Sequence, residues 1–177
     1  MHKSISIINT FPTALLIIML AVPFSSMNFF NHASAQENGF NIAEAPFYQS
    51  INGNVTSTRI LNVEGIPQSE VSFSENALIN GNIPILNQGT FLESNHPNKI
   101  IGNGKGIITS SDGQTVTWNA EDIGKVARNG SIFYQGFIYF DTTSNGSLNF
   151  LKDSVGLYVH KVGEEVSQRN IWQWKVK

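Results

Sequence analysis

The chain of 177 residues contains no cysteine, and this absence excludes several kinds of chemistry at once. Without thiols there is no disulfide, no cysteine nucleophile, no zinc–thiolate centre and no iron–sulfur cluster. Charged residues are also few, at 14% of the chain. The stability of the fold must therefore come from burial of apolar side chains rather than from cross-links.

Clustered positive charge is missing as well. The chain has 11 Lys and Arg residues against 13 Asp and Glu residues, and the basic residues form no run. Contact with phosphates requires a clustered cationic surface, so we expect no nucleic-acid partner. An anionic membrane surface is an equally poor partner for the body of the protein.

The N-terminus has the pattern of an export signal over residues 1–35. A lysine near the start is followed by an unbroken apolar stretch at 14–22, and Ala33-Ser34-Ala35 provides the small residues that a signal peptidase requires. We predict a signal helix that is cleaved to leave Gln36 as the new N-terminus. The alternative is an uncleaved membrane anchor through residues 11–24. In both cases the body of the protein is expected to be secreted or extracytoplasmic.

Three Asn-x-Ser/Thr sequons follow the signal, at Asn54, Asn129 and Asn145. Each is a candidate glycosylation site if the host modifies exported proteins, and chance in an Asn-rich chain is the alternative. Asn129 and Asn145 precede glycines, and Asn-Gly is also a tight-turn signal. Both interpretations place these two residues on exposed loops.

Residues for metal or phosphate chemistry are scarce. After the signal only His96 and His160 remain, without matching carboxylate spacing, and no Gly-x-Ser-x-Gly sequence marks a hydrolase. Gly102, Gly104 and Gly106 do not match a Walker phosphate loop. They instead leave one face of a strand bare, for close approach of another backbone or, alternatively, of a carbohydrate or small ligand. We predict no metal and no cofactor.

Short apolar runs alternate with turn residues at intervals of about ten residues. No 3.6-residue apolar repeat extends past two turns, so the class is all-β. We predict a flexible leader at 36–45 and one domain at 46–177, a single antiparallel β-barrel of about eight strands. A sandwich is the alternative architecture.

The strand predictions follow these runs. Strands are expected at 55–63, 70–73, 77–79, 83–91, 99–109, 114–119, 131–142, 148–151, 155–162 and 170–176. Turns are expected at Ser74-Glu75-Asn76, Asn80-Gly81-Asn82 and the Asp-Gly of residues 110–113. The best helical candidate is a single turn at 120–123.

Aromatic residues concentrate in two strands near the C-terminus. The segment 132–140 is apolar on both faces, which predicts cover on both sides by a leader, a loop or a second subunit. Trp172 and Trp174 share one face of the last strand, where they either seal the barrel or form a binding wall. Core packing is the ordinary role of such rings, and a ligand cradle is the alternative. The aromatic candidates for ligand binding are Trp118, Tyr134, Phe137, Tyr139, Trp172 and Trp174.

Glu70 is the carboxylate that we add to these candidates. It lies among apolar strand residues, and an inward-facing glutamate would have a perturbed pKa. For Glu93, Asp141 and Glu165 a solvated surface position is the simpler interpretation.

The sequence from Gly102 to Lys175 contains three recognisable stretches: "GNGKGIITSSDGQTVTW", "GSIFYQGFIYFDTTSNGSLNFL" and "VGLYVHKV" followed by "NIWQWK". This pattern resembles small uncharacterised exported prokaryotic proteins, archaeal ones among them. They look like calycin-type barrels, the broad group that contains lipocalins, avidins and allene oxide cyclase. The resemblance implies an eight-stranded antiparallel barrel whose mouth holds a small apolar ligand, and it implies no catalytic residues.

Together these features predict an exported, non-enzymatic binding module for a small apolar or amphipathic ligand. Two alternatives remain. The first is a cofactor-free isomerase or cyclase, which would need a buried polar cluster, such as Glu70 with a tyrosine, in the barrel cavity. The second is a structural cell-surface protein in which the strand at 132–140 forms a homo-oligomer interface.

Overall fold

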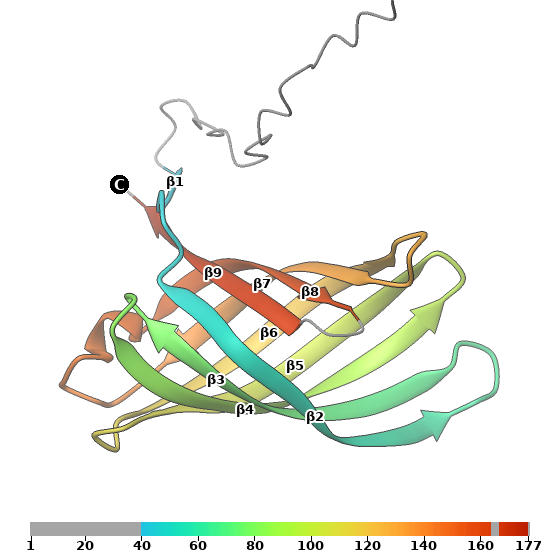
Figure 1. Ribbon diagram of the computed structural model, residues 1–177, viewed down its shortest axis with the longest axis horizontal. Coiled ribbons are helices and arrows are strands. Elements are labelled where there is room, and N and C mark those ends of the chain that lie inside the picture. Colours follow the sequence, from blue (N-terminus) through green and yellow to red (C-terminus); the bar gives the residue numbers. More distant parts are fainter. Residues whose placement is uncertain (1–39, 164–166, 177) are drawn as a thin grey trace, which may run out of the picture. The chain divides into compact units, whose positions relative to one another are not determined.

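The computed structural model describes residues 40–163 and 167–176 (Figure 1). The predicted signal and its cleavage site lie outside the described residues. Within them, no helix is long and apolar enough to cross a membrane. The elements are β1 (Phe40–Ile42), β2 (Tyr48–Asn62), β3 (Gln68–Ile79), β4 (Ile83–His96), β5 (Lys99–Ser110), β6 (Thr115–Val126), β7 (Ile132–Asp141), the 3₁₀ helix η1 (Asn149–Leu151), β8 (Ser154–Val162) and β9 (Ser167–Val176).

Eight of these strands close into a barrel. Each strand from β2 to β8 pairs antiparallel with the next along the chain, and β9 pairs with both β8 and β2. The closing contact is short, with Tyr48 opposite Ile171 and Gln49 opposite Asn170. β1 lies within the predicted leader and extends this seam by pairing with residues 174–176 of β9. The prediction of a single antiparallel barrel is confirmed over a sandwich.

Alternation of the sequence explains which side chains enter the barrel. Along β6, Val116, Trp118, Ala120 and Asp122 are buried, while the residues between them are exposed. Successive side chains of a strand point to opposite faces, so these four share the interior. The hairpin turns also agree with the sequence. Asn80-Gly81 connects β3 to β4 with both residues at positive φ, as a tight hairpin requires.

Three segments differ from the sequence prediction. β3 runs unbroken through the expected turn at 74–76, and the helical candidate at 120–123 lies inside β6. The strand expected at 148–151 contains η1 instead. Pairing with neighbouring strands overrides the weak local preferences of residues such as Glu75 and Asp122.

The interior has a closed apolar half and an open polar half. Leu148 and Leu151, beside and within η1, are fully buried in the same core cluster as Phe47 and Phe140. These side chains plug one end of the barrel. Toward the other end β2 leaves β9 after only two residue pairs, and register shifts interrupt its pairing with β3. β2 therefore diverges from β9 toward this second end (Figure 1).

The described residues leave the outer face of β7 uncovered, and the expected cover by a leader or by a second subunit stays a prediction. Phe133 and Tyr139 are 40% and 52% exposed. The Nζ atom of Lys161 lies 5.7 Å from the centre of the Phe133 ring, and Phe137 contacts Tyr139 edge to face. The described residues place no further layer over these rings.

Candidate functional site

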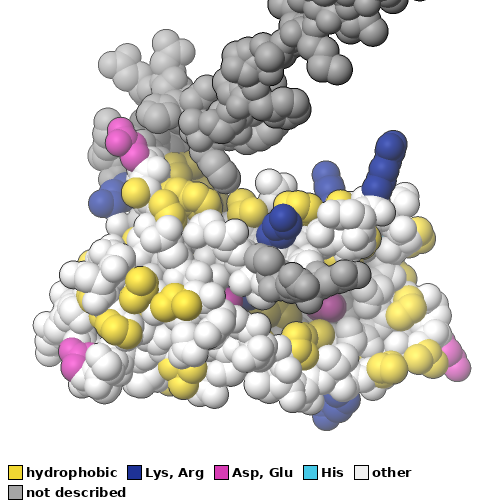
Figure 2. Space-filling view, in the orientation of Figure 1, with side chains coloured by type: hydrophobic (Ala, Val, Ile, Leu, Met, Phe, Trp, Pro, Cys, Tyr) yellow, Lys and Arg dark blue, Asp and Glu magenta, His cyan; other side chains and the backbone are white. Residues whose placement is uncertain are grey.

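A cavity of about 510 Å³ occupies the open half of the barrel. Its lining comes from β2, β3, β4, β6, β7, β8 and β9, together with Gly163. Figure 2 shows this face of the molecule hollowed, with hydrophobic and acidic side chains visible in the hollow. A volume of this size suits a small organic molecule.

Three aromatic rings form the base of the cavity. Phe73, Phe91 and Trp118 pack together with ring centres 5.8 to 6.2 Å apart. Phe73 and Phe91 line the cavity, while Trp118 is buried beneath them and its indole N–H donates to Asn87 Oδ1 at 2.9 Å. The base is therefore apolar on its cavity side, and its buried indole N–H is satisfied.

The bare glycine face of β5 makes room for these rings. A Cβ atom on Gly104 would lie 2.6 Å from the Phe91 ring, and one on Gly106 would lie 2.4 Å from the Trp118 ring. Both separations are far below van der Waals contact. The close approach of another backbone expected from this face is found at Gly106, where the Gln88 backbone oxygen would lie 2.3 Å from the Cβ atom. Aromatic side chains of the protein approach the same face.

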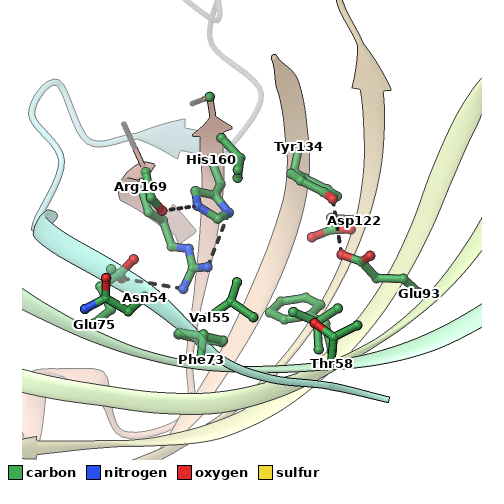
Figure 3. Close-up of a pocket in the computed structure, with 16 residues that line it drawn as sticks. Asn54, Val55, Thr58, Phe73, Glu75, Glu93, Asp122, Tyr134, His160 and Arg169 are labelled. Carbon is green, nitrogen blue, oxygen red and sulfur yellow. Dashed lines mark hydrogen bonds and ion pairs between the residues drawn. The ribbon is translucent and has the colours of Figure 1, made fainter. Parts of the chain in front are cut away.

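The first wall of the cavity, here called the ion-pair wall, consists of Glu75, Arg169 and His160 (Figure 3). Arg169 is only 6% exposed, and its Nη1 lies 3.5 Å from Glu75 Oε1. The guanidinium stands 4.7 Å from the centre of the Phe73 ring. The Tyr48 hydroxyl also donates to Glu75, and burial together with the Glu75 charge raises the pKa of Tyr48 well above its usual value. The buried charges are therefore paired and hydrogen-bonded, as low-dielectric surroundings require.

The same contacts fix the protonation state of His160. Arg169 Nη2 lies 3.3 Å from His160 Nδ1, and a guanidinium only donates, so Nδ1 is the acceptor. The proton of the neutral ring is then on Nε2, which donates to Ser167 Oγ at 2.9 Å. Burial and the Arg169 charge lower the pKa of His160 well below its usual value, so the ring stays neutral at physiological pH.

A second group of lining residues, here called the acidic wall, carries Asp122, Glu93 and Tyr134 (Figure 3). It adjoins the ion-pair wall, because the Tyr134 ring stacks on His160 with ring centres 5.8 Å apart. Asp122 Oδ2 accepts a hydrogen bond from the Tyr158 hydroxyl at 2.5 Å, and Glu93 Oε1 accepts one from the Tyr134 hydroxyl at 3.1 Å. Burial raises the pKa of both carboxyls, and the charge of Asp122 raises that of Glu93 further. Asp122 Oδ1 is buried with no hydrogen-bond partner among the described residues.

Two of the sequence candidates lie at the cavity, and Glu70 does not. Tyr134 lines the acidic wall, and Trp118 lies in the base. Glu70 forms an ion pair with Arg59 at 3.0 Å between exposed parts of β2 and β3. The cavity carboxylate on β4 is Glu93, for which a solvated position was expected.

The other four aromatic candidates lie on the outside of the barrel. Ile138 and Phe140 face inward, so Phe137 and Tyr139 project from the opposite face of β7. Ile171 faces inward in the same way, which places Trp172 and Trp174 on the outer face of β9. The alternating aromatic residues of β7 and β9 were identified from the sequence. Which face of each strand points into the barrel was not.

Sequence reasoning missed Glu75, Asp122 and Arg169 as site residues. Asp122 continues the alternation of Val116, Trp118 and Ala120 along β6. Extending the predicted strand past Asn119 would therefore have placed Asp122 on the inward face. Glu75 lay in a segment that was interpreted as a turn.

The three sequon asparagines are exposed in the structure. Asn54 also lines the mouth of the cavity, whereas Asn129 lies in the turn between β6 and β7. Among the described residues, no three His, Cys, Asp or Glu side chains are grouped so that they could hold a metal ion.

No protein-family model matches the chain, and no curated protein sequence matches it. Solved structures show the same fold at low sequence identity. A β-barrel-like protein from Acinetobacter baumannii has a TM-score of 0.64 at 7% identity, over 80% of this chain and 99% of that one. A protein of unknown function from Clostridium acetobutylicum has a TM-score of 0.63 at 13% identity, over 77% and 99%. A conserved protein of unknown function from Rhodopseudomonas palustris has a TM-score of 0.57 at 12% identity, over 80% and 100%.

Proposed function

We propose that the chain is an exported, calycin-like module that binds one small amphipathic molecule in its barrel without converting it. The observation that carries the proposal is the cavity of about 510 Å³, closed at one end and open at the other. Ligand sites in proteins are typically concave and largely apolar, with a few fixed polar groups. The aromatic base with the two polar walls has this composition.

Unpartnered polar atoms support a bound molecule rather than an empty barrel. Asp122 Oδ1 and Arg169 Nε are buried and have no hydrogen-bond partner among the described residues. A buried polar atom without a partner costs about 1–3 kcal/mol. Both side chains line the cavity, so a small rotation on binding would bring these atoms to a ligand group or water and recover this free energy. Phe73 and Phe91 offer apolar contact in the same cavity.

The test is native mass spectrometry of the protein purified from its own host, followed by mild denaturation and identification of what is released. The variant Val71→Trp fills the cavity from β3, and Leu92→Trp on the exposed outer face of β4 is the matched control. We expect a bound molecule in the wild type and in Leu92→Trp, and its loss in Val71→Trp. Retention of the same molecule by folded Val71→Trp would exclude the cavity as its site.

A cofactor-free isomerase or cyclase is the second candidate. The observation that favours it is the pair of carboxylates with raised pKa values, each held by a tyrosine hydroxyl, at Asp122 and Glu93. Groups of this kind exchange protons with a bound substrate near neutral pH. Incubating the released molecule with fresh protein separates the candidates. An unchanged mass and chromatographic retention time favour binding, whereas time-dependent conversion that is lost in Glu93→Gln favours catalysis.

A further inference from the structure

We propose that the polar end of the ligand is a cation, and that an organic ammonium group binds at the acidic wall between Asp122 and Glu93. This inference rests on the proposed binding function and names the chemical class of the ligand. It starts from the charges that line the cavity. Among the described lining residues these are Glu75, Glu93 and Asp122 against one guanidinium, Arg169.

The single cation is already engaged through both Nη atoms, and only its buried Nε has no hydrogen-bond partner among the described residues. Arg169 pairs with Glu75 and donates a second hydrogen bond to His160, which is neutral. Neither Asp122 nor Glu93 has a salt bridge with any described residue, and each accepts a hydrogen bond from a neutral tyrosine. Burial is the largest effect on the pKa of Asp122 and raises it, while the more distant Arg169 charge lowers it. Buried carboxylates without a counter-charge are costly unless they are protonated or a cation joins them.

An ammonium group fits what the acidic wall lacks. It carries a positive charge and up to three N–H donors, which could serve the Asp122 and Glu93 carboxylates that line the cavity. The faces of aromatic rings attract cations, and Phe91 and Tyr134 line the cavity beside these carboxylates. Figure 3 shows Asp122, Glu93 and Tyr134 gathered on one side of His160, with Arg169 on its other side.

The apolar end of the ligand then has a place nearer the mouth. Val55, Val71 and Val162 line the cavity, and Val55 is 64% exposed, so the apolar lining extends to solvent at the mouth. An amine with an aliphatic tail can bury its head at the acidic wall and its tail against these valines. An anionic head would instead meet three carboxylates and a guanidinium whose Nη atoms are already paired.

The experiment compares three probes with one tail and different heads, octylamine, octanol and octanoate, by isothermal titration calorimetry on the full chain. We expect octylamine to bind tightest. Asp122→Asn and Glu93→Gln should each weaken octylamine by about tenfold to a hundredfold, the range for a lost charge-assisted hydrogen bond. Glu70→Gln removes an exposed carboxylate of the outer surface and should leave octylamine binding unchanged.

Proton release supplies a second readout that a general loss of packing would not produce. Because burial raises the carboxyl pKa values, the acidic wall keeps its protons to a higher pH than ordinary carboxyls do. Binding a cation favours the ionised form, so protons leave as octylamine binds, and its affinity falls as the pH is lowered. The titratable and charged groups around these two carboxyls are Tyr134, Tyr158, His160, Arg169 and Glu75.

Titrations in buffers of different ionisation enthalpy measure this release, which should shrink in Glu93→Gln. Octanol or octanoate binding as tightly as octylamine would overturn the cation inference and leave the binding function standing. If none of the three probes binds and native mass spectrometry finds the barrel empty, the proposed function fails together with the inference.

Discussion

At the scale of single residues, the pair of Arg169 with Glu75 ties β9 to β3 inside the barrel. Arg169→Met keeps an apolar stem over Phe73 but leaves the Glu75 charge buried without its cation. Breaking a buried pair from one side costs about 3–5 kcal/mol. We expect a loss of this size in the free energy of unfolding, measured by urea denaturation.

Two further variants make that expectation specific. The double variant Arg169→Met/Glu75→Gln removes both charges and should recover most of the loss, because no charge stays uncompensated. Arg59→Met breaks the exposed pair with Glu70 and should cost less than about 1 kcal/mol. Equal effects at Arg169 and Arg59 would contradict the burial argument.

The residues of the site were only partly predictable from the sequence. Trp118 and Tyr134 stood out because large rings are conspicuous in strand patterns. Glu75 and Asp122 did not, because Ser-Glu-Asn and Ala-Glu-Asp-Ile resemble turns when they are read locally. Both carboxylates are held in strands by pairing with residues that are distant in the sequence. Glu75 pairs with Asn87, and Asp122 pairs with Gly102. Such pairing leaves no local signal in the sequence.

At the scale of elements, the glycines of β5 leave room for large side chains from the neighbouring strands β4 and β6. Gly104→Ala would place a methyl group 2.6 Å from the Phe91 ring, in a base that has no room for it. Overpacking of this kind costs about 1–3 kcal/mol, and the displaced ring would change the shape of the cavity. We expect a lower urea midpoint and weaker binding of any cavity ligand.

Asn103→Ala is the matched control for this prediction, because Asn103 is the exposed neighbour of Gly104 on the outer face of β5. It should change the midpoint little. A Gly104→Ala protein as stable as Asn103→Ala would show that the base can shift, and the close-packed description of the cavity would then be wrong.

Elements with strong local signals were predicted well. The hairpins at Asn80-Gly81 and Asp112-Gly113 were found because their turns need residues that tolerate positive φ. The segment at 148–151 was not, because short apolar runs suit a strand or a buried turn equally. The leucines of this segment close one end of the barrel, and that role can be recognised only once the barrel end is known.

At the scale of the whole molecule, the predicted signal cleavage site precedes the first described strand in the sequence. β1 begins at Phe40, so cleavage after Ala35 would leave every described strand in the mature chain. We therefore expect export to remove residues 1–35 without cost to the barrel. The mass of the protein recovered from an export-competent host should correspond to residues 36–177, with a urea midpoint equal to that of the uncleaved chain.

Blocking the cleavage gives the matched comparison. Ala33→Lys and Ala35→Lys place long charged side chains where signal peptidase needs small ones, so the uncleaved mass should accumulate in the membrane fraction. If the wild type is itself recovered only at full mass and with the membrane, the segment at 11–24 is an anchor. The barrel would then be held at the external surface of the membrane by the chain before β1. Its cavity would take ligands from the solution around that membrane.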